Sequence, residues 1–372
     1  MIQYAELTTV THDTVVVCVV PEDPEQECHT RVGDQEIVTT GPVQLATLSG
    51  LEPNASYELR VEGAPESDYL PGRVQTLEVV GANARTVIAT ANDVHFGEVE
   101  CGRWDTDPAV GPIITVRPGE APYPQTMNNA AIDEMLACNP DVVIVKGDLT
   151  DRGTPEEYAD FLAAYGRLGA RTHHVRGNHD AMIEPHLVSE RGPYAIVGDG
   201  VVCAVLDTVR AGDDQGELAG EQLDWLDALA HDSADPVLVF GHHHPWDPAD
   251  PERNADYFGI NPDDSERLVA LFARRPAVHG YFAGHTHRNR LRRFAAVPEV
   301  PIVEVSCTKD YPGVWAEYRV DSHGYAQVVH RISAPAALDW TERTRELFFG
   351  LYRNYALGPI EHRCFVQKFT RG

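Results

Sequence analysis

Lysine is nearly absent from this sequence. The chain of 372 residues has 30 basic side chains, and its lysines are Lys146, Lys309 and Lys368. Arginine supplies the remaining positive charge. A bias of this kind is typical of a GC-rich genome and by itself indicates no function.

Long apolar runs are also missing. No stretch reaches the roughly 18 apolar residues that a transmembrane helix needs, so we expect no membrane span. Residues 1–13 show no basic segment followed by an apolar one, and we therefore expect no secretory signal. Seven scattered cysteines without Cys-x-x-Cys spacing then indicate reduced thiols in a cytoplasmic protein.

Positive charge is scarce relative to negative charge. The chain has 57 acidic residues and a formal net charge of -27. A field of this sign repels phosphate backbones, so we expect neither general nucleic-acid binding nor binding to anionic membranes. The excess of carboxylates also keeps a protein soluble, which is the simpler explanation of the composition.

The length allows two or three domains, and residues 1–82 differ in pattern from the rest. They contain β-branched runs and a turn at Pro53 that precedes an alternating strand, Tyr57, Leu59 and Val61. This segment resembles a fibronectin type III-like β-sandwich. We expect it to form a separate all-β domain.

Residues 83–334 alternate apolar runs with helical segments, which predicts an α/β domain. The helical segments have clear start signals. Thr154, for example, is followed by Pro155 and two glutamates, the pattern of an N-cap with proline at the first helical position.

Residues 335–372 are expected to form a C-terminal helical extension. Several of their apolar side chains have helical spacing and would share one face: Trp340, Leu347, Phe348, Leu351, Tyr352 and Tyr355. Two interpretations stay open. The face packs on the chain's own core, or it forms a homodimer contact or a cap over an active site.

Polar motifs follow five of the apolar runs in the α/β segment. In α/β sheets, ligand sites form beyond the carboxyl ends of the strands, so we expect the motifs to meet in one crevice. Their carboxylate, imidazole and amide groups, without cysteine, suit borderline or hard metal ions. The motifs are Asp93-Val94-His95, Gly147-Asp148, Gly177-Asn178-His179-Asp180, His242-His243-His244-Pro245 and Gly284-His285-Thr286-His287.

This order of motifs resembles that of the calcineurin-like metallophosphoesterase superfamily, over about residues 86–330. The resemblance implies a four-layer α/β/β/α sandwich with two metal ions. It implies a first metal bound by Asp93, His95 and His287. It implies a second metal bound by Asn178, His243 and His285. Asp148 would bridge the two, and its charge would offset the repulsion between two dications about 4 Å apart.

The triple histidine leaves a question of register. In similar enzymes the ligand stands two residues before the proline, which selects His243. His242 is the alternative, and His244 would face substrate or lie behind the ligands. Manganese and iron fit this ligand set best, with zinc as a further option.

Three further residues are candidates for catalysis. The resemblance implies that a hydroxide between the metals attacks phosphorus and that His179 protonates the leaving oxygen. Asp151 would orient His179, and Arg152 would bind phosphate. The alternative for Asp151 and Arg152 is a surface ion pair at a helix start.

The long segment 96–125, with Glu98, Arg103, Trp104 and Asp105, either shapes the pocket or is a solvated insertion.

Within the superfamily, the motifs most resemble class III cyclic nucleotide phosphodiesterases and glycerophosphodiesterases. We therefore expect a phosphodiesterase acting on small phosphate esters. A phosphomonoesterase, including one that acts on phosphoproteins, is the second hypothesis. A non-catalytic scaffold is the third, and the complete set of ligand positions together with His179 argues against it.

Overall fold

The N-terminal part of the chain is built only of strands, as predicted. The computed structural model describes residues 1–81, 83–103, 111–188 and 192–369. All pairings in the two N-terminal sheets are antiparallel, and their buried side chains form one core. One sheet has the order β1 (Ile2–Val10), β2 (Thr14–Pro21), β5 (Gln44–Ser49). The other has the order β4 (Gln35–Thr39), β3 (Cys28–Val32), β6 (Ser56–Val61), β7 (Arg73–Gln75).

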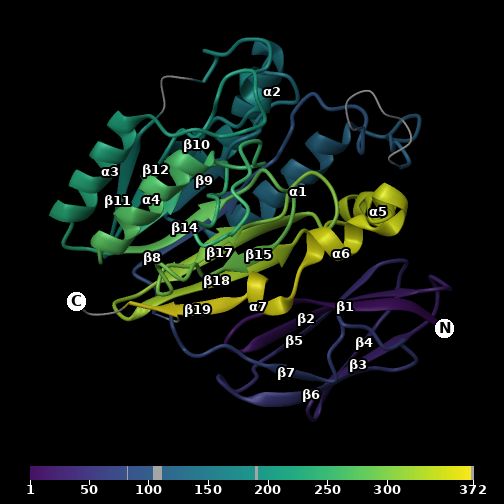
Figure 1. The fold of residues 1–372 in the computed structure, drawn as a ribbon. Coiled ribbons are helices and arrows are strands. Elements are labelled where there is room, and N and C mark those ends of the chain that lie inside the picture. The colour runs from purple at the N-terminus through teal and green to yellow at the C-terminus, as the bar shows by residue number, and fades with distance from the viewer. Residues whose placement is uncertain (82, 104–110, 189–191, 370–372) are drawn as a thin grey trace.

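Two six-stranded sheets form the α/β part (Figure 1). In the first sheet, β8 to β10 are parallel and β17 to β19 are antiparallel. Its order is β10 (Thr172–Val175), β9 (Val142–Lys146), β8 (Thr86–Ala91), β17 (Val314–Val320), β18 (Gly324–Arg331), β19 (Phe365–Lys368). The second sheet has the order β11 (Tyr194–Gly198), β12 (Val201–Val205), β13 (Val237–Phe240), β14 (Val278–Ala283), β16 (Ile302–Glu304), β15 (Arg290–Arg292).

Alternation along the central strands explains how the layers pack. Val142 and Ile144 of β9 belong to the core between the two sheets, which also contains Phe240 and Phe282 of the second sheet. Because successive side chains of a strand point to opposite faces, the residues between them face the helices instead. The predicted mixed α/β fold is therefore confirmed, with strands that are apolar on both faces.

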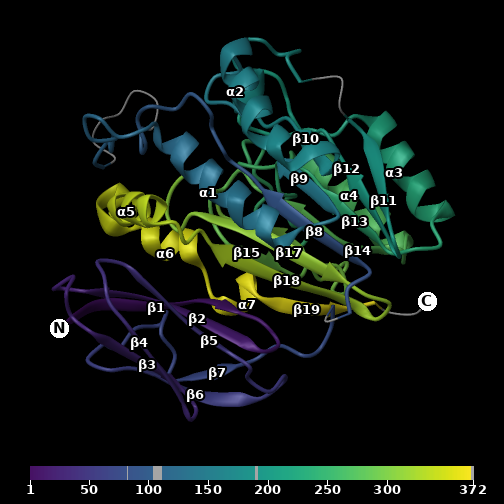
Figure 2. The same cartoon turned by 180° about the vertical axis from the view of Figure 1, so that it is seen from behind.

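Helices cover the outer face of each sheet (Figure 2). On the first sheet lie α1 (Tyr123–Cys138) and α2 (Pro155–Tyr165). On the second lie α3 (Gly220–Asp232) and α4 (Pro262–Arg274). The predicted start of α2 is present, since the Thr154 side chain accepts a hydrogen bond from Glu157 N and the Glu157 side chain accepts one from Thr154 N. No helix in the described ranges is long and apolar enough to cross a membrane.

The C-terminal segment differs from the single apolar helix face that the spacing predicts. It forms α5 (Pro335–Thr344), η5 (Leu347–Gly350), α6 (Tyr352–Leu357), α7 (Ile360–Arg363) and then strand β19. Positive φ angles at Phe348 and Phe349, 50° and 56°, interrupt the helix, so Leu351 is 70% exposed. Trp340 remains buried and stacks on Tyr123 of α1 at 4.2 Å. The extension is therefore not wholly helical, because its last residues complete the first sheet.

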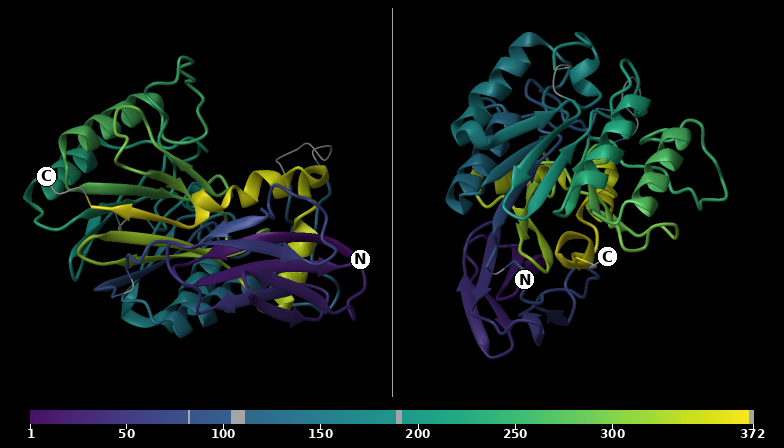
Figure 3. Two further views of the ribbon diagram at one scale, coloured as in Figure 1. Left: turned by 90° about the horizontal axis from the view of Figure 1, so that it is seen from below. Right: turned by 90° about the vertical axis from the view of Figure 1, so that its left-hand side faces the viewer.

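The N-terminal strands lie against the α/β part (Figure 3), and buried polar contacts join the two. The guanidinium of Arg363, which is 2% exposed, donates to the carbonyl oxygens of Leu7, at 2.9 Å, and Thr8. The buried carboxylate of Glu6 accepts from Arg345 at 2.7 Å and from the Tyr311 hydroxyl at 2.9 Å. Because these groups are out of contact with water, each depends on its partner.

Replacing Arg363 with methionine should destabilise this junction. The change leaves the buried Leu7 and Thr8 carbonyls without the donor seen here, and we expect the free energy of unfolding to fall by about 3 kcal/mol. Chemical denaturation would measure the fall. The matched control is Arg353→Met, whose side chain is 41% exposed, where we expect a change under about 0.5 kcal/mol. Equal effects of the two substitutions would contradict the role of Arg363.

Candidate metal centre

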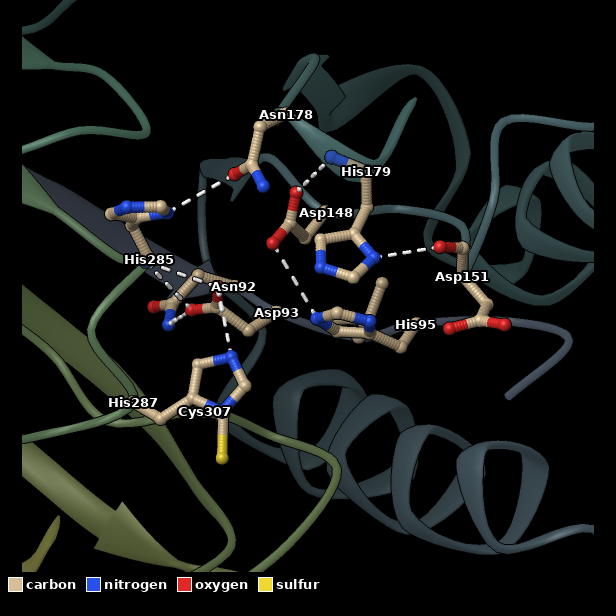
Figure 4. A network of polar contacts seen from close by, with 12 residues as sticks. Asn92, Asp93, His95, Asp148, Asp151, Asn178, His179, His285, His287 and Cys307 are labelled. Atoms are coloured by element: carbon tan, nitrogen blue, oxygen red, sulfur yellow. Dashed lines mark hydrogen bonds and ion pairs between the residues drawn. The ribbon is translucent and has the colours of Figure 1, made fainter. Parts of the chain in front are cut away.

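The five predicted motifs converge, and each begins within three residues of a strand's carboxyl end. Figure 4 labels residues from four of these motifs. Asp93 and His95 follow β8, Asp148 follows β9 and Asn178 follows β10, all in the first sheet. The remaining two motifs follow β13 and β14 of the second sheet. The candidate site thus lies where the carboxyl ends of strands from both sheets meet, and not at one sheet alone.

Four of the predicted ligands form one group. Asp93, His95, Asp148 and His287 each offer an atom within 4.8 Å of the others. His95 Nε2 lies 3.5 Å from Asp148 Oδ2, and His287 Nε2 lies 3.4 Å from Asp93 Oδ1. Each of these two imidazole nitrogens therefore lies close to one of the two carboxylates of the group.

A second group lies beside the first. His242, His243 and His285 offer nitrogen atoms within 4.8 Å of one another. Asn178 Oδ1 is 3.1 Å from His285 Nδ1 and 3.1 Å from His242 Nε2. Asp148 belongs to the first group, yet its Oδ2 lies 3.4 Å from His242 Nε2. It is thus the carboxylate that borders both groups.

The backbone is strained where the predicted ligands lie. Nine described residues other than glycine have positive φ, and five of them are predicted ligands: Asp93 (52°), His95 (45°), Asp148 (49°), His285 (70°) and His287 (52°). Left-handed backbone costs free energy in non-glycine residues and persists only where the surroundings impose it. Such strain concentrates at functional sites, which supports assigning the site to this position.

Several buried histidine nitrogens in the site have no hydrogen-bond partner. They are His95 Nδ1 and Nε2, His243 Nε2 and His285 Nε2. An unpaired buried polar atom is costly, and bound metal ions would satisfy one nitrogen of each of these rings. Burial lowers the pKa of His243 and of His285 well below the usual range, so both rings are neutral, the form that binds metals. The donor set fits a dinuclear metal site.

The structure distinguishes the three consecutive histidines. His243 Nδ1 lies 2.9 Å from the Thr208 hydroxyl, which leaves its Nε2 free. Both nitrogens of His242 have partners, Lys146 O at 2.8 Å and Asn178 Oδ1 at 3.1 Å. His244 is 2% exposed and its ring packs against Tyr257. His242 Nε2 also lies 3.4 Å from Asp148 Oδ2, so the choice of His243 over His242 as a ligand stays a prediction.

His179 borders the first group, and its ring centroid is 4.5 Å from that of His95. Its Nδ1 lies 2.6 Å from the backbone oxygen of Asp151, and an oxygen of the Asp151 carboxylate lies within 4.8 Å of a nitrogen of His179 and of His95 (Figure 4). The hydrogen bond that orients His179 therefore comes from the main-chain oxygen of Asp151. Arg152 is exposed, and its backbone N–H donates to Glu157 at 3.0 Å. A phosphate-binding role for Arg152 stays a prediction.

Asp180, the last residue of the Gly177-Asn178-His179-Asp180 motif, joins two ligand loops. Its buried carboxylate accepts from Leu149 N at 3.1 Å, from Thr150 N at 2.8 Å, from the Thr150 hydroxyl at 2.6 Å and from Gly177 N at 2.7 Å. Burial and the nearby Asp148 charge raise its pKa to about 6. The sequence carried no signal of this function, because the hydrogen bonds to Leu149 and Thr150 join segments about 30 residues apart.

Segment 96–125 is only partly solvated. The Glu98 side chain is 14% exposed and contacts Lys309 at 2.6 Å, whereas Arg103 forms an exposed pair with Glu100. Burial raises the pKa of Glu98, but the Lys309 ammonium more than offsets this, so the net pKa is lowered. Trp104 and Asp105 lie outside the described residues.

Comparison with known proteins places these residues in context. The sequence profile of the calcineurin-like phosphoesterase family matches residues 86–289. The glycerophosphodiester phosphodiesterase GpdQ of Enterobacter lignolyticus is 31% identical over 220 residues, which cover 56% of this chain and 73% of that protein. A cAMP/cGMP dual specificity phosphodiesterase of Mycobacterium tuberculosis is 25% identical over 263 residues, covering 68% and 71%.

A solved structure is similar in fold. The dimetal phosphatase from Danio rerio aligns with a TM-score of 0.54 over 77% of this chain and all of that one (100%). The sequence identity is 12%, so this likeness concerns the arrangement of the elements alone.

Gly177 should be essential for the geometry of the site. A Cβ at this position would lie 2.1 Å from Asp148 Oδ1 and 2.3 Å from Asp148 N. Gly177→Ala should therefore displace Asp148 and lower the metal content of the purified protein, measured by inductively coupled plasma mass spectrometry. Gly166→Ala is the control, since nothing lies within 4 Å of its Cβ. A Gly177→Ala protein with wild-type metal content would contradict the geometry.

Proposed function

This chain belongs to the calcineurin-like phosphoesterase family, and on that premise we propose that it is a dinuclear-metal-dependent hydrolase that prefers small phosphate diesters. The observation that carries the proposal is the set of unpartnered, buried imidazole nitrogens around Asp148. The preference for diesters is supported by the relatives, because those of E. lignolyticus and M. tuberculosis bear the names of phosphodiesterases.

The proposed ligands follow the two groups. The first metal is assigned to Asp93, His95, His287 and the bridging Asp148. The second is assigned to Asn178, His243, His285 and the same bridge. Two bound metal ions supply Lewis-acid charge for the phosphoryl oxygens and lower the pKa of water. Oxygen and nitrogen donors fit manganese and iron best, with zinc as a further option.

His179 is proposed as the proton donor to the leaving oxygen. The Asp151 carbonyl oxygen can only accept, so the close contact at 2.6 Å requires the proton on His179 Nδ1. His179 Nε2 is then the atom that holds or transfers a proton. Burial lowers the pKa of His179, but the charge of Asp148 more than offsets this, and the net pKa is raised. The ring is thereby kept in the form that can donate.

The remaining assignments belong to the same proposal. They are a β-sandwich domain of fibronectin type III type at 1–82, a four-layer phosphoesterase domain at 83–334 and an extension at 335–372. A cytoplasmic location and homodimer formation are retained as proposals. A phosphomonoesterase, including one acting on phosphoproteins, is the alternative activity. A scaffold without catalysis is disfavoured because every predicted ligand position carries a donor.

A substrate comparison tests the activity. We expect the purified enzyme, loaded with Mn²⁺, to hydrolyse bis-p-nitrophenyl phosphate with at least about 10-fold higher kcat/KM than p-nitrophenyl phosphate. A difference of that size corresponds to about 1.4 kcal/mol in transition-state stabilisation. The reverse order would favour the phosphomonoesterase. Hydrolysis of neither ester by protein that holds two metal ions would contradict the enzyme proposal.

His179→Ala should retain metal and lose turnover by a factor of about 100 to 10,000, the usual contribution of a general acid. The loss should be larger for an alkyl leaving group than for p-nitrophenolate, which departs without a proton. Kinetics with both kinds of diester, together with metal analysis, would measure this. His231→Ala, at an exposed position, is the control. Loss of metal from the His179→Ala protein would instead identify His179 as a ligand.

A further inference from the structure

Two of the chain's three lysines are buried next to the candidate site. Lys146, at the end of β9, is 0% exposed, and Lys309 is 4% exposed. Lys309 Nζ lies 2.6 Å from Glu98 Oε2 and 3.2 Å from Asp310 Oδ2. Glu98, Lys309 and Asp310 thus form one buried ionic cluster, the Glu98–Lys309–Asp310 triad. In a chain so poor in lysine, this placement calls for an explanation.

Each carboxylate of the triad lies behind one histidine of the first metal group. Glu98 Oε2 is 4.0 Å from His95 Nδ1, and Asp310 Oδ2 is 4.0 Å from His287 Nδ1. On the opposite side of each ring, Nε2 faces the carboxylates of Asp148 and Asp93. Both rings are therefore placed between a proposed ligand carboxylate and a carboxylate of the triad.

We propose that Lys309 is a positioning residue that holds the Glu98 and Asp310 carboxylates 4.0 Å from Nδ1 of His95 and of His287, where their charge keeps the ring proton on Nδ1. The inference rests on the proposed dinuclear site. With the proton on Nδ1, both rings present Nε2 to the first metal, and the carboxylates increase the basicity of these nitrogens. Lys309 touches neither substrate nor metal and acts only through its two partners.

The charges explain why a lysine is needed. Glu98 and Asp310 are buried close to Asp93 and Asp148, and four carboxylates in one region would repel one another strongly. A single ammonium between Glu98 and Asp310 offsets part of this repulsion and fixes their distance. A compact ammonium is a point charge that can lie between two carboxylates, which the planar fork of arginine does less readily.

The C-terminal extension supports the same cluster. Asp310 Oδ1 accepts from the Tyr352 hydroxyl at 2.6 Å, and the Lys309 carbonyl accepts from Trp340 Nε1 at 2.9 Å. The Cys307 thiol donates to the same Asp310 oxygen at 2.9 Å. The extension therefore has a function that neither a separate core nor a dimer contact provides, because it fixes the segment that orients His287.

The inference is specific to the first metal. At the second, His243 Nδ1 is oriented by the neutral hydroxyl of Thr208, which has no contact with the triad. Removing the ammonium should consequently weaken one site and leave the other intact. This asymmetry separates a positioning function from general destabilisation, which would affect both sites.

Metal titration of Lys309→Met tests the proposal. Calorimetric titration of the metal-free wild-type protein with Mn²⁺ should give two sites, and the variant should keep one while the other weakens by about 10 to 100-fold. Electron paramagnetic resonance at one to two equivalents of Mn²⁺ should show the coupled pair in the wild type and an isolated ion in the variant. Lys368→Met, at the 63% exposed lysine, is the matched control with both sites retained.

Two backgrounds identify which site is affected. In His243→Ala, which keeps the first site, adding Lys309→Met should weaken the remaining Mn²⁺ binding by the same factor. In His287→Ala, which keeps the second, it should change nothing. Unchanged affinities in both backgrounds would overturn the inference, as would equal losses in both. Failure of the wild type to bind two ions would instead overturn the proposed dinuclear site.

Tyr352→Phe provides an independent variant should Lys309→Met fail to fold. It removes only the hydroxyl that donates to Asp310, so we expect a smaller weakening, about 3 to 10-fold, at the same site. Tyr355→Phe, a change of the same kind on the same helix, should leave both affinities unchanged. Identical Mn²⁺ affinities for Tyr352→Phe and the wild type would count against the proposal.

Discussion

Burial of two carboxylates in one histidine cluster is the constraint on which the rest of the site depends. Asp93 is 0% exposed and Asp148 is 2% exposed, and neither can remain ionised there without nearby positive charge. Burial opposes ionisation, yet the histidines around Asp148 hold its pKa well below the usual range. The side chains behind the ligands, the loop geometry and the C-terminal extension can each be understood as ways of meeting this constraint.

Holding such charges together requires a backbone that does not relax. Gly147, Gly177 and Gly284 let the ligand loops approach closely, since a Cβ at any of them would lie under 3.0 Å from a neighbouring loop. The ligands that follow two of these glycines adopt left-handed conformations. Asp180 then joins the Asp148 and Asn178 loops through a carboxylate that accepts four hydrogen bonds. The same loops therefore contain both the strained, left-handed backbone and the hydrogen bonds that hold it in place.

The sequence predicted the site better than its surroundings, for a physical reason. Asp93, Asp148 and His285 follow strands directly, so strand ends fix their positions within a few ångströms whatever the loops do. The break at Phe348 and the strand β19 depend on contacts with distant segments, and local spacing carries no record of those. The orienting carbonyl of Asp151 and the pairing of Lys309 with Glu98 likewise depend on folding, because neither backbone direction nor long-range pairing is encoded in a motif.

Electrostatics connects the acidic surface with an anionic substrate. A chain of net charge -27 repels phosphate esters at long range, although screening confines that field to about 10 Å at moderate salt. Within that distance the bound metal ions would outweigh the charges of Asp93 and Asp148, so attraction would begin only at the site. A triad that stabilises the first metal would then also govern the sign of the local field. Substrate binding and metal occupancy are therefore linked through the same buried charges, and Lys309 acts on both.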